Sequence, residues 1–155
     1  KEGNTLLDDY IQTRRDGFGP ETRRRVLLGT YVLSSGYYDA YYGKALAVRD
    51  LMKKDFVKAF ETVDAVLTPT TPTPAFKIGE KADDPVSMYL ADVFTVTANL
   101  VGTPAISLPS GWTTGEKSNG KKLPLAIHIT APHAQEEMLF TIAKEFEAEI
   151  GFKLL

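Results

Sequence analysis

Few side chains in this sequence could perform chemistry by themselves. There is no cysteine, and the two histidines, His128 and His133, are too few for a common zinc site. The serines considered as nucleophiles are Ser34, Ser35, Ser107 and Ser110. None of them stands in a Gly-x-Ser-x-Gly motif, and none has a base at a spacing that would activate it. The sequence therefore predicts no catalytic residue and no metal site within the chain.

The same serines and histidines have structural interpretations. Ser35 precedes Gly36 and is typical of a residue that ends a helix. Ser107 alternates within a predicted buried strand. His128 lies opposite the apolar face of its predicted strand, so we expect a hydrogen-bonded or solvated imidazole rather than a base or a metal ligand.

Composition indicates one globular domain, and the absence of cysteine fits the expected cytoplasmic location. The chain has 155 residues, is 43% hydrophobic and 25% charged, and carries a formal net charge of -2. That charge argues against a broad nucleic-acid-binding face, although five arginines gather near the start. No apolar run approaches the roughly 20 residues that span a bilayer, so no membrane contact is expected.

The sequence predicts mainly helices in the first half of the chain. Residues 1–18 form a polar lead-in with one or two exposed helix turns, and Gly19-Pro20-Glu21 marks the start of a helix that ends near Leu33. Apolar residues then recur at helical spacing from about Tyr37 to Thr62. The prolines of residues 68–74 are expected to keep that segment out of a sheet.

The second half alternates helices and strands. Asp84-Pro85 predicts a capped helix start, with a break around Thr95 to Thr97 before Gly102. Residues 105–108 and 123–129 read as two strands joined by a solvated hairpin loop over 110–122. An amphipathic helix is expected over residues 134–150. This order of elements predicts an α/β architecture.

Four blocks carry a specific resemblance. They are GFGPETRRRVLLGTYVLSSGYYDAYY, VDAVLTPTTPTPAF, DDPVSMYLADVFTVTANLVGTPAISLPSG and LPLAIHITAPHAQEEMLFTIAKEFE. The blocks resemble the carboxy-terminal part of the amidase signature family. The first block and MYLADVFT are similar to the glutamine-using A subunits of bacterial glutamyl-tRNA(Gln)/aspartyl-tRNA(Asn) amidotransferases. This resemblance covers nearly the whole chain.

The resemblance implies a fold and a missing catalytic centre. The chain is expected to form the carboxy-terminal half of the amidase-signature α/β/α fold, a mixed sheet flanked by helices, with residues 1–18 as a lead-in and 19–155 as part of a single amidase domain. The Gly/Ser-rich segment of the family, with its Ser-Ser-Lys catalytic residues, is expected upstream of Lys1. This chain alone is therefore predicted to be inactive.

The resemblance also assigns two substrate-binding residues. Family A subunits bind glutamine through an arginine before the LLGTY segment and an aspartate in the MY..D block, which fall on Arg25 and Asp92. A guanidinium suits the α-carboxylate of glutamine and a carboxylate suits its α-ammonium. Without the resemblance, Arg25 reads as a surface arginine paired with a neighbouring carboxylate, and Asp92 as a solvated helix acid.

The sequence departs from the family pattern in two segments. Ala126, Ile127 and His128 stand where Gly-Leu-Gln is common, and Thr97 stands where a proline is common. We expect these changes to leave the fold intact.

The expected function follows from the resemblance. The parent protein would hydrolyse glutamine and pass ammonia to a partner that amidates Glu-tRNA(Gln). The expected partners are a B subunit, which handles tRNA, ATP and magnesium, and a small C subunit; no cofactor is expected in this chain. A stand-alone amidase of the same superfamily and a non-catalytic interaction module are the alternatives.

Overall fold

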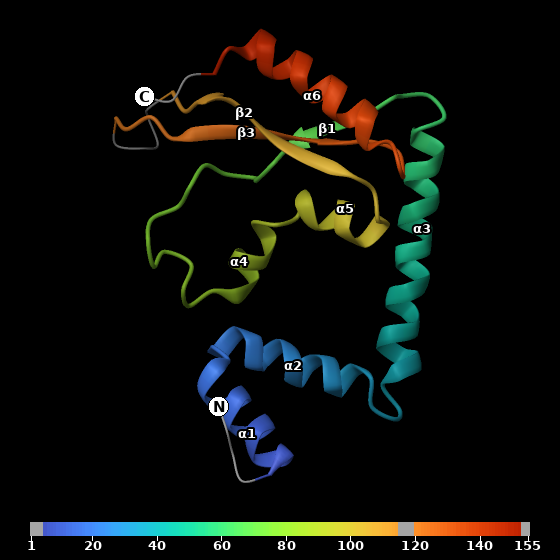
Figure 1. The fold of residues 1–155 in the computed structure, drawn as a ribbon, viewed down its shortest axis with the longest axis vertical. Helices are drawn as coiled ribbons and strands as arrows, with labels where there is room; N and C mark the ends of the chain where they lie inside the picture. Colours follow the sequence, from blue (N-terminus) through green and yellow to red (C-terminus); the bar gives the residue numbers. More distant parts are fainter. Residues whose placement is uncertain (1–4, 115–119, 153–155) are drawn as a thin grey trace. The chain divides into compact units, whose positions relative to one another are not determined.

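The computed structural model describes residues 5–114 and 120–152, and the chain forms two compact units, Lys1–Val48 and Arg49–Leu155. In chain order the elements are α1 (Leu6–Gly17), α2 (Pro20–Val32), the π-helix η1 (Tyr38–Gly43), α3 (Lys44–Ala59), β1 (Val66–Pro69), α4 (Pro85–Leu90), α5 (Thr95–Val101), β2 (Ala105–Trp112), β3 (Pro124–Thr130) and α6 (Glu136–Ile150) (Figure 1). The expected division into a lead-in over 1–18 and one domain over 19–155 stays a prediction.

The first unit begins with two helices whose starts follow from local sequence. The Thr5 hydroxyl caps α1 by accepting a hydrogen bond from the Asp8 amide at 3.1 Å. α1 runs for 12 residues and is therefore longer than the one or two turns expected in the lead-in. α2 begins at Pro20, as predicted, because a proline at the first helical position lacks only a donor that would be unpaired.

The long helix predicted from Tyr37 to Thr62 is divided in the structure. Its first part is the π-helix η1, which ends at Gly43, and α3 follows from Lys44. Tyrosine rings contact one another here: the ring centroids of Tyr31 and Tyr37 lie 4.3 Å apart and those of Tyr38 and Tyr42 lie 5.1 Å apart. Glycine has a low helix propensity, which is consistent with a change of helix type at Gly43.

The second unit is built on a three-stranded sheet in the order β1-β3-β2, with both strand pairs antiparallel. β3 is the central strand, so its alternating side chains decide what each face of the sheet presents. Ile127 and Ile129 lie on one face, and His128 and Thr130 on the other. The predicted strand over residues 123–129 is confirmed as β3. The expected α/β architecture is also confirmed, and the sheet in this part of the fold is antiparallel.

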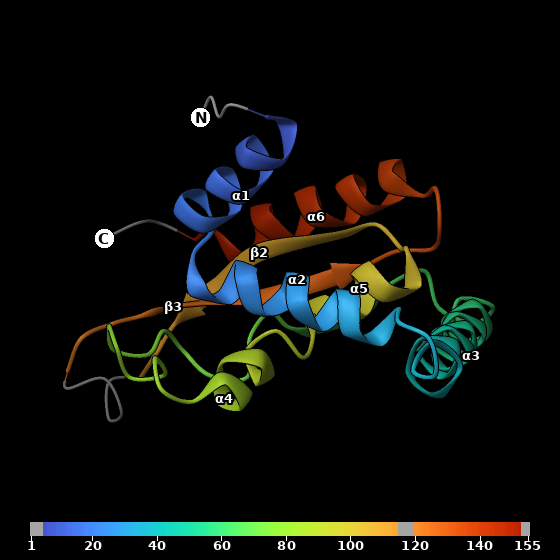
Figure 2. The ribbon, with the colours of Figure 1, turned by 90° about the horizontal axis from the view of Figure 1, so that it is seen from below.

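The helix α6 covers the apolar face of this sheet (Figures 1 and 2). The buried cluster between them consists of Leu108, Ile129, Ala131, Leu139 and Ala143. The pattern of apolar residues predicted this helix over residues 134–150, and the structure confirms it over Glu136–Ile150. Burial of these side chains is the main stabilising contribution to the second unit.

Two strand predictions need correction. Thr68 and Pro69 belong to β1 rather than to the loop. Proline is tolerated there because β1 lies at the edge of the sheet, where the missing N–H does not interrupt the hydrogen bonds of a central strand. β2 continues to Trp112 through an irregularity between Pro109 and Gly111, so the hairpin loop is shorter than residues 110–122. Part of that loop, residues 115–119, lies outside the described residues.

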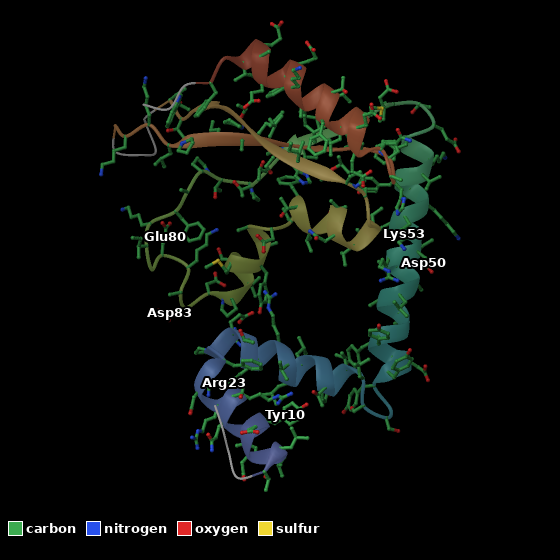
Figure 3. All side chains as sticks on the ribbon, viewed as in Figure 1. Tyr10, Arg23, Asp50, Lys53, Glu80 and Asp83 are labelled. Atoms are coloured by element: carbon green, nitrogen blue, oxygen red, sulfur yellow. The ribbon has the colours of Figure 1, made fainter. Side chains whose placement is uncertain are left out.

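The predicted position of the helix break between β1 and α5 also needs correction. Figure 3 shows Glu80 and Asp83 in the turns that precede α4. The Asp84 carboxylate caps α4 by accepting a hydrogen bond from the Ser87 amide at 3.0 Å, as its position before Pro85 predicts. The helix is interrupted over residues 91–94 rather than around Thr95 to Thr97, because Thr95 begins α5.

The buried cluster gives a test of which contacts stabilise the second unit. We expect Leu139→Ala to lower the free energy of unfolding by about 2 to 5 kcal/mol, because Leu139 is 3% exposed and its removal leaves a cavity. Leu67→Ala is the matched control, since Leu67 is 58% exposed on the same sheet. Urea unfolding monitored by circular dichroism measures both. Equal losses in the two variants would contradict this account of the core.

Candidate functional site

Arg25 lies on α2, where a short ion-pair network holds it. Its Nε donates to Glu21 Oε1 at 2.9 Å, and Arg24 Nη1 donates to Glu21 Oε2 at 2.8 Å. The Arg25 side chain is 66% exposed. Exposed pairs of this kind contribute little to stability, because solvent screens them. The pairing with Glu21 matches the interpretation of Arg25 as a surface arginine.

Asp92 lies in the turn between α4 and α5. Its amide donates to the Tyr89 carbonyl at 3.1 Å, and its carbonyl accepts from the Val96 amide at 2.9 Å and from the Thr95 hydroxyl at 3.3 Å. The backbone of Asp92 is therefore fixed by hydrogen bonds on both sides. Its side chain is exposed, and no hydrogen bond or ion pair joins the carboxylate to another described residue of its unit. A fixed, exposed carboxylate can meet an ammonium group.

Arg25 belongs to the first unit and Asp92 to the second, and each is described within its own unit. Their role in binding glutamine stays a prediction.

A row of polar side chains crosses the sheet on the face opposite α6. Thr68 and Ser107 flank His128 in the strand register, so the three side chains point to the same face. The Ser107 hydroxyl bonds to the Thr70 hydroxyl at 3.2 Å. Ser107 is thus engaged with a threonine, and no described contact joins it to a base. The strand that carries Ser107 is less buried than predicted, since Leu108 is its only buried residue.

A pocket of about 370 Å³ lies against this polar face. Its lining residues are Thr95, Ala98, Asn99, Gly102, Thr103, Ala105 and His128. The left-handed backbone at Gly102, with φ of 82°, ends α5 and turns the chain toward β2, which brings helix and strand residues around one space. The pocket begins one helical turn from Asp92, because Thr95 bonds to the Asp92 carbonyl.

His128 is buried in this pocket, contrary to the possibility of a solvated side chain. It is 6% exposed, and burial lowers the pKa of its imidazole below the usual value. The sequence placed His128 opposite the apolar face of its strand, but it did not reveal that residues of α5 line a pocket with it on that second face.

The polar pocket residues were missed by the sequence analysis, although a signal was present. Thr95 and Asn99 stand four residues apart, a spacing that places polar side chains along one side of a helix, and Thr103 follows where α5 has ended. No group of three His, Asp or Glu side chains close enough to hold a metal occurs among residues 5–114 and 120–152. In the same part of the chain, no helix has the length and apolar character needed to cross a membrane.

Comparison with known proteins identifies the family. The Amidase family model matches residues 1–140, and the chain therefore belongs to the amidase family. Within it, the chain is 55% identical over 147 residues to the glutamyl-tRNA(Gln) amidotransferase A subunit of Koribacter versatilis, a match that covers 95% of this chain and 29% of that protein. It is 56% identical over 142 residues to the corresponding A subunit of Syntrophus aciditrophicus, covering 92% of this chain and 28% of that protein.

Solved structures agree with the family assignment. The crystal structure of the glutamyl-tRNA(Gln) amidotransferase A subunit from Thermotoga maritima matches with a TM-score of 0.65 and 40% identity, over 91% of this chain and 29% of that one. Allophanate hydrolase of Kluyveromyces lactis matches with a TM-score of 0.63 at 20% identity, over 92% of this chain and 22% of that one, and shows the shared fold. The chain spans less than a third of the length of these relatives.

The buried histidine makes stability depend on pH. Because the folded pKa of His128 is lowered, the unfolded chain binds a proton more readily as pH falls below about 6.5. The contribution of the neutral His128 to the free energy of unfolding is thus complete above about pH 6.5, and it is lost as the pH falls from there toward the pKa of His128 in the folded chain.

We expect the free energy of unfolding to decline less between pH 7.5 and 5.5 in His128→Gln than in the unaltered chain, because glutamine does not titrate. Urea titrations at several pH values measure the difference, and His133 is present in both proteins. Parallel pH profiles for the two proteins would be inconsistent with a buried, neutral His128.

Proposed function

We propose that the parent of this chain is the glutamine-hydrolysing component of a tRNA-dependent amidotransferase. The supporting observation is the identity of 55 to 56% to the A subunits of glutamyl-tRNA(Gln) amidotransferases over more than nine-tenths of this chain. In this proposal, glutamine and water give glutamate and ammonia, and the ammonia is used to convert Glu-tRNA(Gln) to Gln-tRNA(Gln). The chain contributes one part of the glutamine pocket.

Two charged side chains have the chemistry that the substrate needs. The Arg25 guanidinium donates to the α-carboxylate of glutamine, and the Asp92 carboxylate accepts from its α-ammonium. The backbone bonds around Asp92 support this role, because a carboxylate on a fixed turn loses less conformational freedom when it binds. For Arg25, the incoming carboxylate adds to or replaces the screened pair with Glu21.

The remaining parts of the reaction belong to other chain segments and other subunits. The Ser-Ser-Lys residues that form and hydrolyse the acyl-enzyme are proposed to precede this region in the parent. A B subunit would use ATP and magnesium to activate Glu-tRNA(Gln), and a C subunit would complete a cytoplasmic heterotrimer. A stand-alone amidase differs from this proposal in hydrolysing amides without the B and C subunits.

Mutation of Arg25 tests the pocket directly. In an active parent protein, Arg25→Ala is expected to raise KM for glutamine by about 10- to 100-fold, because a charge-assisted hydrogen bond to the substrate is lost. Arg24→Ala is the matched control, since Arg24 bonds to the same Glu21 from the same helix. Steady-state glutaminase kinetics measure the effect. A similar KM change in both variants would indicate a structural role for the ion-pair network.

Asp92 is tested in the same assay. We expect Asp92→Asn to raise KM for glutamine by about 10- to 100-fold while affecting amide substrates without an α-ammonium much less. Asp83→Asn, a change at an exposed acid in the turns before α4, is the control (Figure 3). Unchanged glutamine kinetics in Asp92→Asn would exclude contact between Asp92 and the substrate.

The 155-residue chain itself is proposed to be inactive. We expect no glutamine hydrolysis by the purified chain in a coupled glutamate assay, with the active parent protein as the positive control. Hydrolysis by the chain would mean that a nucleophile within it had been overlooked.

A further inference from the structure

The surroundings of His128 offer no charge that could balance a proton on its imidazole. His128 pairs with Thr68 and Ser107 across the sheet, and both are uncharged. Burial lowers the pKa of His128, with no contribution from a charged neighbour among the described residues. The closest acid along α5 is Asp92, whose side chain is exposed. The other residues that line the pocket are also uncharged: Thr95, Ala98, Asn99, Gly102, Thr103 and Ala105. An imidazolium here is therefore a buried charge without a bonded counter-ion.

The pocket is the side from which water can reach a protonated His128. The other sides are closed, because β1 and β2 flank β3 in the sheet and the buried cluster under α6 fills the opposite face. α5 is a helix of only seven residues, and its half-buried Thr95 and exposed Asn99 line the pocket. A short helix with exposed side chains opens at a lower free energy than a paired strand. Hydration of an imidazolium therefore disturbs α5 before it disturbs the sheet.

A series of hydrogen bonds connects this wall of the pocket with Asp92. Asn99 Nδ2 donates to the Thr95 carbonyl at 3.0 Å, and the Thr95 hydroxyl donates to the Asp92 carbonyl at 3.3 Å. The Val96 amide donates to the same Asp92 carbonyl at 2.9 Å. The first turn of α5 thus fixes the backbone of Asp92, and a displacement of α5 also displaces the Asp92 carboxylate.

We propose that His128 is a positioning residue through which acid pH weakens the binding of glutamine at Asp92. Neutral His128 leaves α5 in place, so that Asp92 meets the α-ammonium of glutamine. Protonated His128 disturbs α5, and its positive charge also opposes the α-ammonium. The inference rests on the proposed function and adds a regulation of the same site. Because coupling between two binding events is reciprocal, bound glutamine in turn makes His128 harder to protonate.

The first test compares glutamine kinetics of the active parent protein at pH 7.5 and pH 5.0. We expect the ratio of KM at pH 5.0 to KM at pH 7.5 to be about fivefold larger in the unaltered protein than in His128→Gln, because glutamine does not titrate. KM is suited to this test, since it does not depend on the fraction of enzyme that stays active. His133→Gln is the matched control, because His133 is exposed, and it should keep the ratio of the unaltered protein. Equal ratios in the unaltered protein and His128→Gln would overturn the proposal.

A substrate without an α-ammonium separates the route through Asp92 from a general effect of pH on the enzyme. Glutaramate is glutamine without its amino group, and its affinity is measured as a substrate or as a competitive inhibitor. We expect His128→Gln to change the pH dependence of glutaramate affinity much less than that of glutamine, because Asp92 has no ammonium to meet. An equal change for the two compounds would refute the route through Asp92.

NMR follows the same linkage in the 155-residue chain without catalysis. The ring C–H signals of His128 and the backbone amide signal of Asp92 are recorded from pH 7.5 to pH 5.0. We expect the Asp92 amide to shift with the same midpoint as His128 and to lose that transition in His128→Gln. The Thr141 amide is the control, since Thr141 lies on α6, which covers the opposite face of the sheet. An Asp92 amide that does not follow the titration of His128 would contradict the proposal.

The glutamine kinetics also distinguish failure of this inference from failure of the proposed function. If Asp92→Asn leaves KM for glutamine unchanged, the proposed role of Asp92 and the inference are both rejected. If Asp92→Asn raises KM as expected, but the ratio of KM at the two pH values does not depend on His128, the proposed function stands and only the inference is rejected.

Discussion

The packing of α6 against β3 is the constraint on which the second unit depends. Ile129 is 1% exposed and Leu139 is 3% exposed, and their contact fixes which face of the sheet is apolar. Because side chains alternate along a strand, placing Ile129 under α6 forces His128 and Thr130 onto the other face. The polar row, the buried imidazole and the pocket beside α5 therefore all follow from one apolar contact on the opposite side of the sheet.

Asp92 depends on a different kind of constraint. Its position is set by backbone hydrogen bonds in the interruption between α4 and α5, where the amide and the carbonyl of the same residue are both engaged. This arrangement leaves the carboxylate exposed on a fixed turn. Arg25, by contrast, is held by side-chain ion pairs along α2.

Much of the local structure could be predicted from the sequence, and the errors have identifiable causes. Pro20 and the Asp84-Pro85 pair marked helix starts correctly, because a cap or a first-turn proline acts within three or four residues. The inclusion of Pro69 in a strand was missed, because whether a proline is tolerated depends on whether its strand is central or at an edge. That property depends on pairing with β3, more than fifty residues later.

The order of residues alone was enough to recognise the family, to predict the main helices and the alternation of β3, and to nominate Arg25 and Asp92 for glutamine binding. The helices and the alternation are encoded in short segments, where propensity, capping and periodicity act locally. The family and the two nominated residues came instead from the resemblance of longer sequence blocks. Two further features became known only from the folded chain: β3 is the central strand, and Thr95, Asn99 and Thr103 line one pocket together with His128. Burial and pocket formation arise from contacts between segments distant in sequence, so no local pattern specifies them.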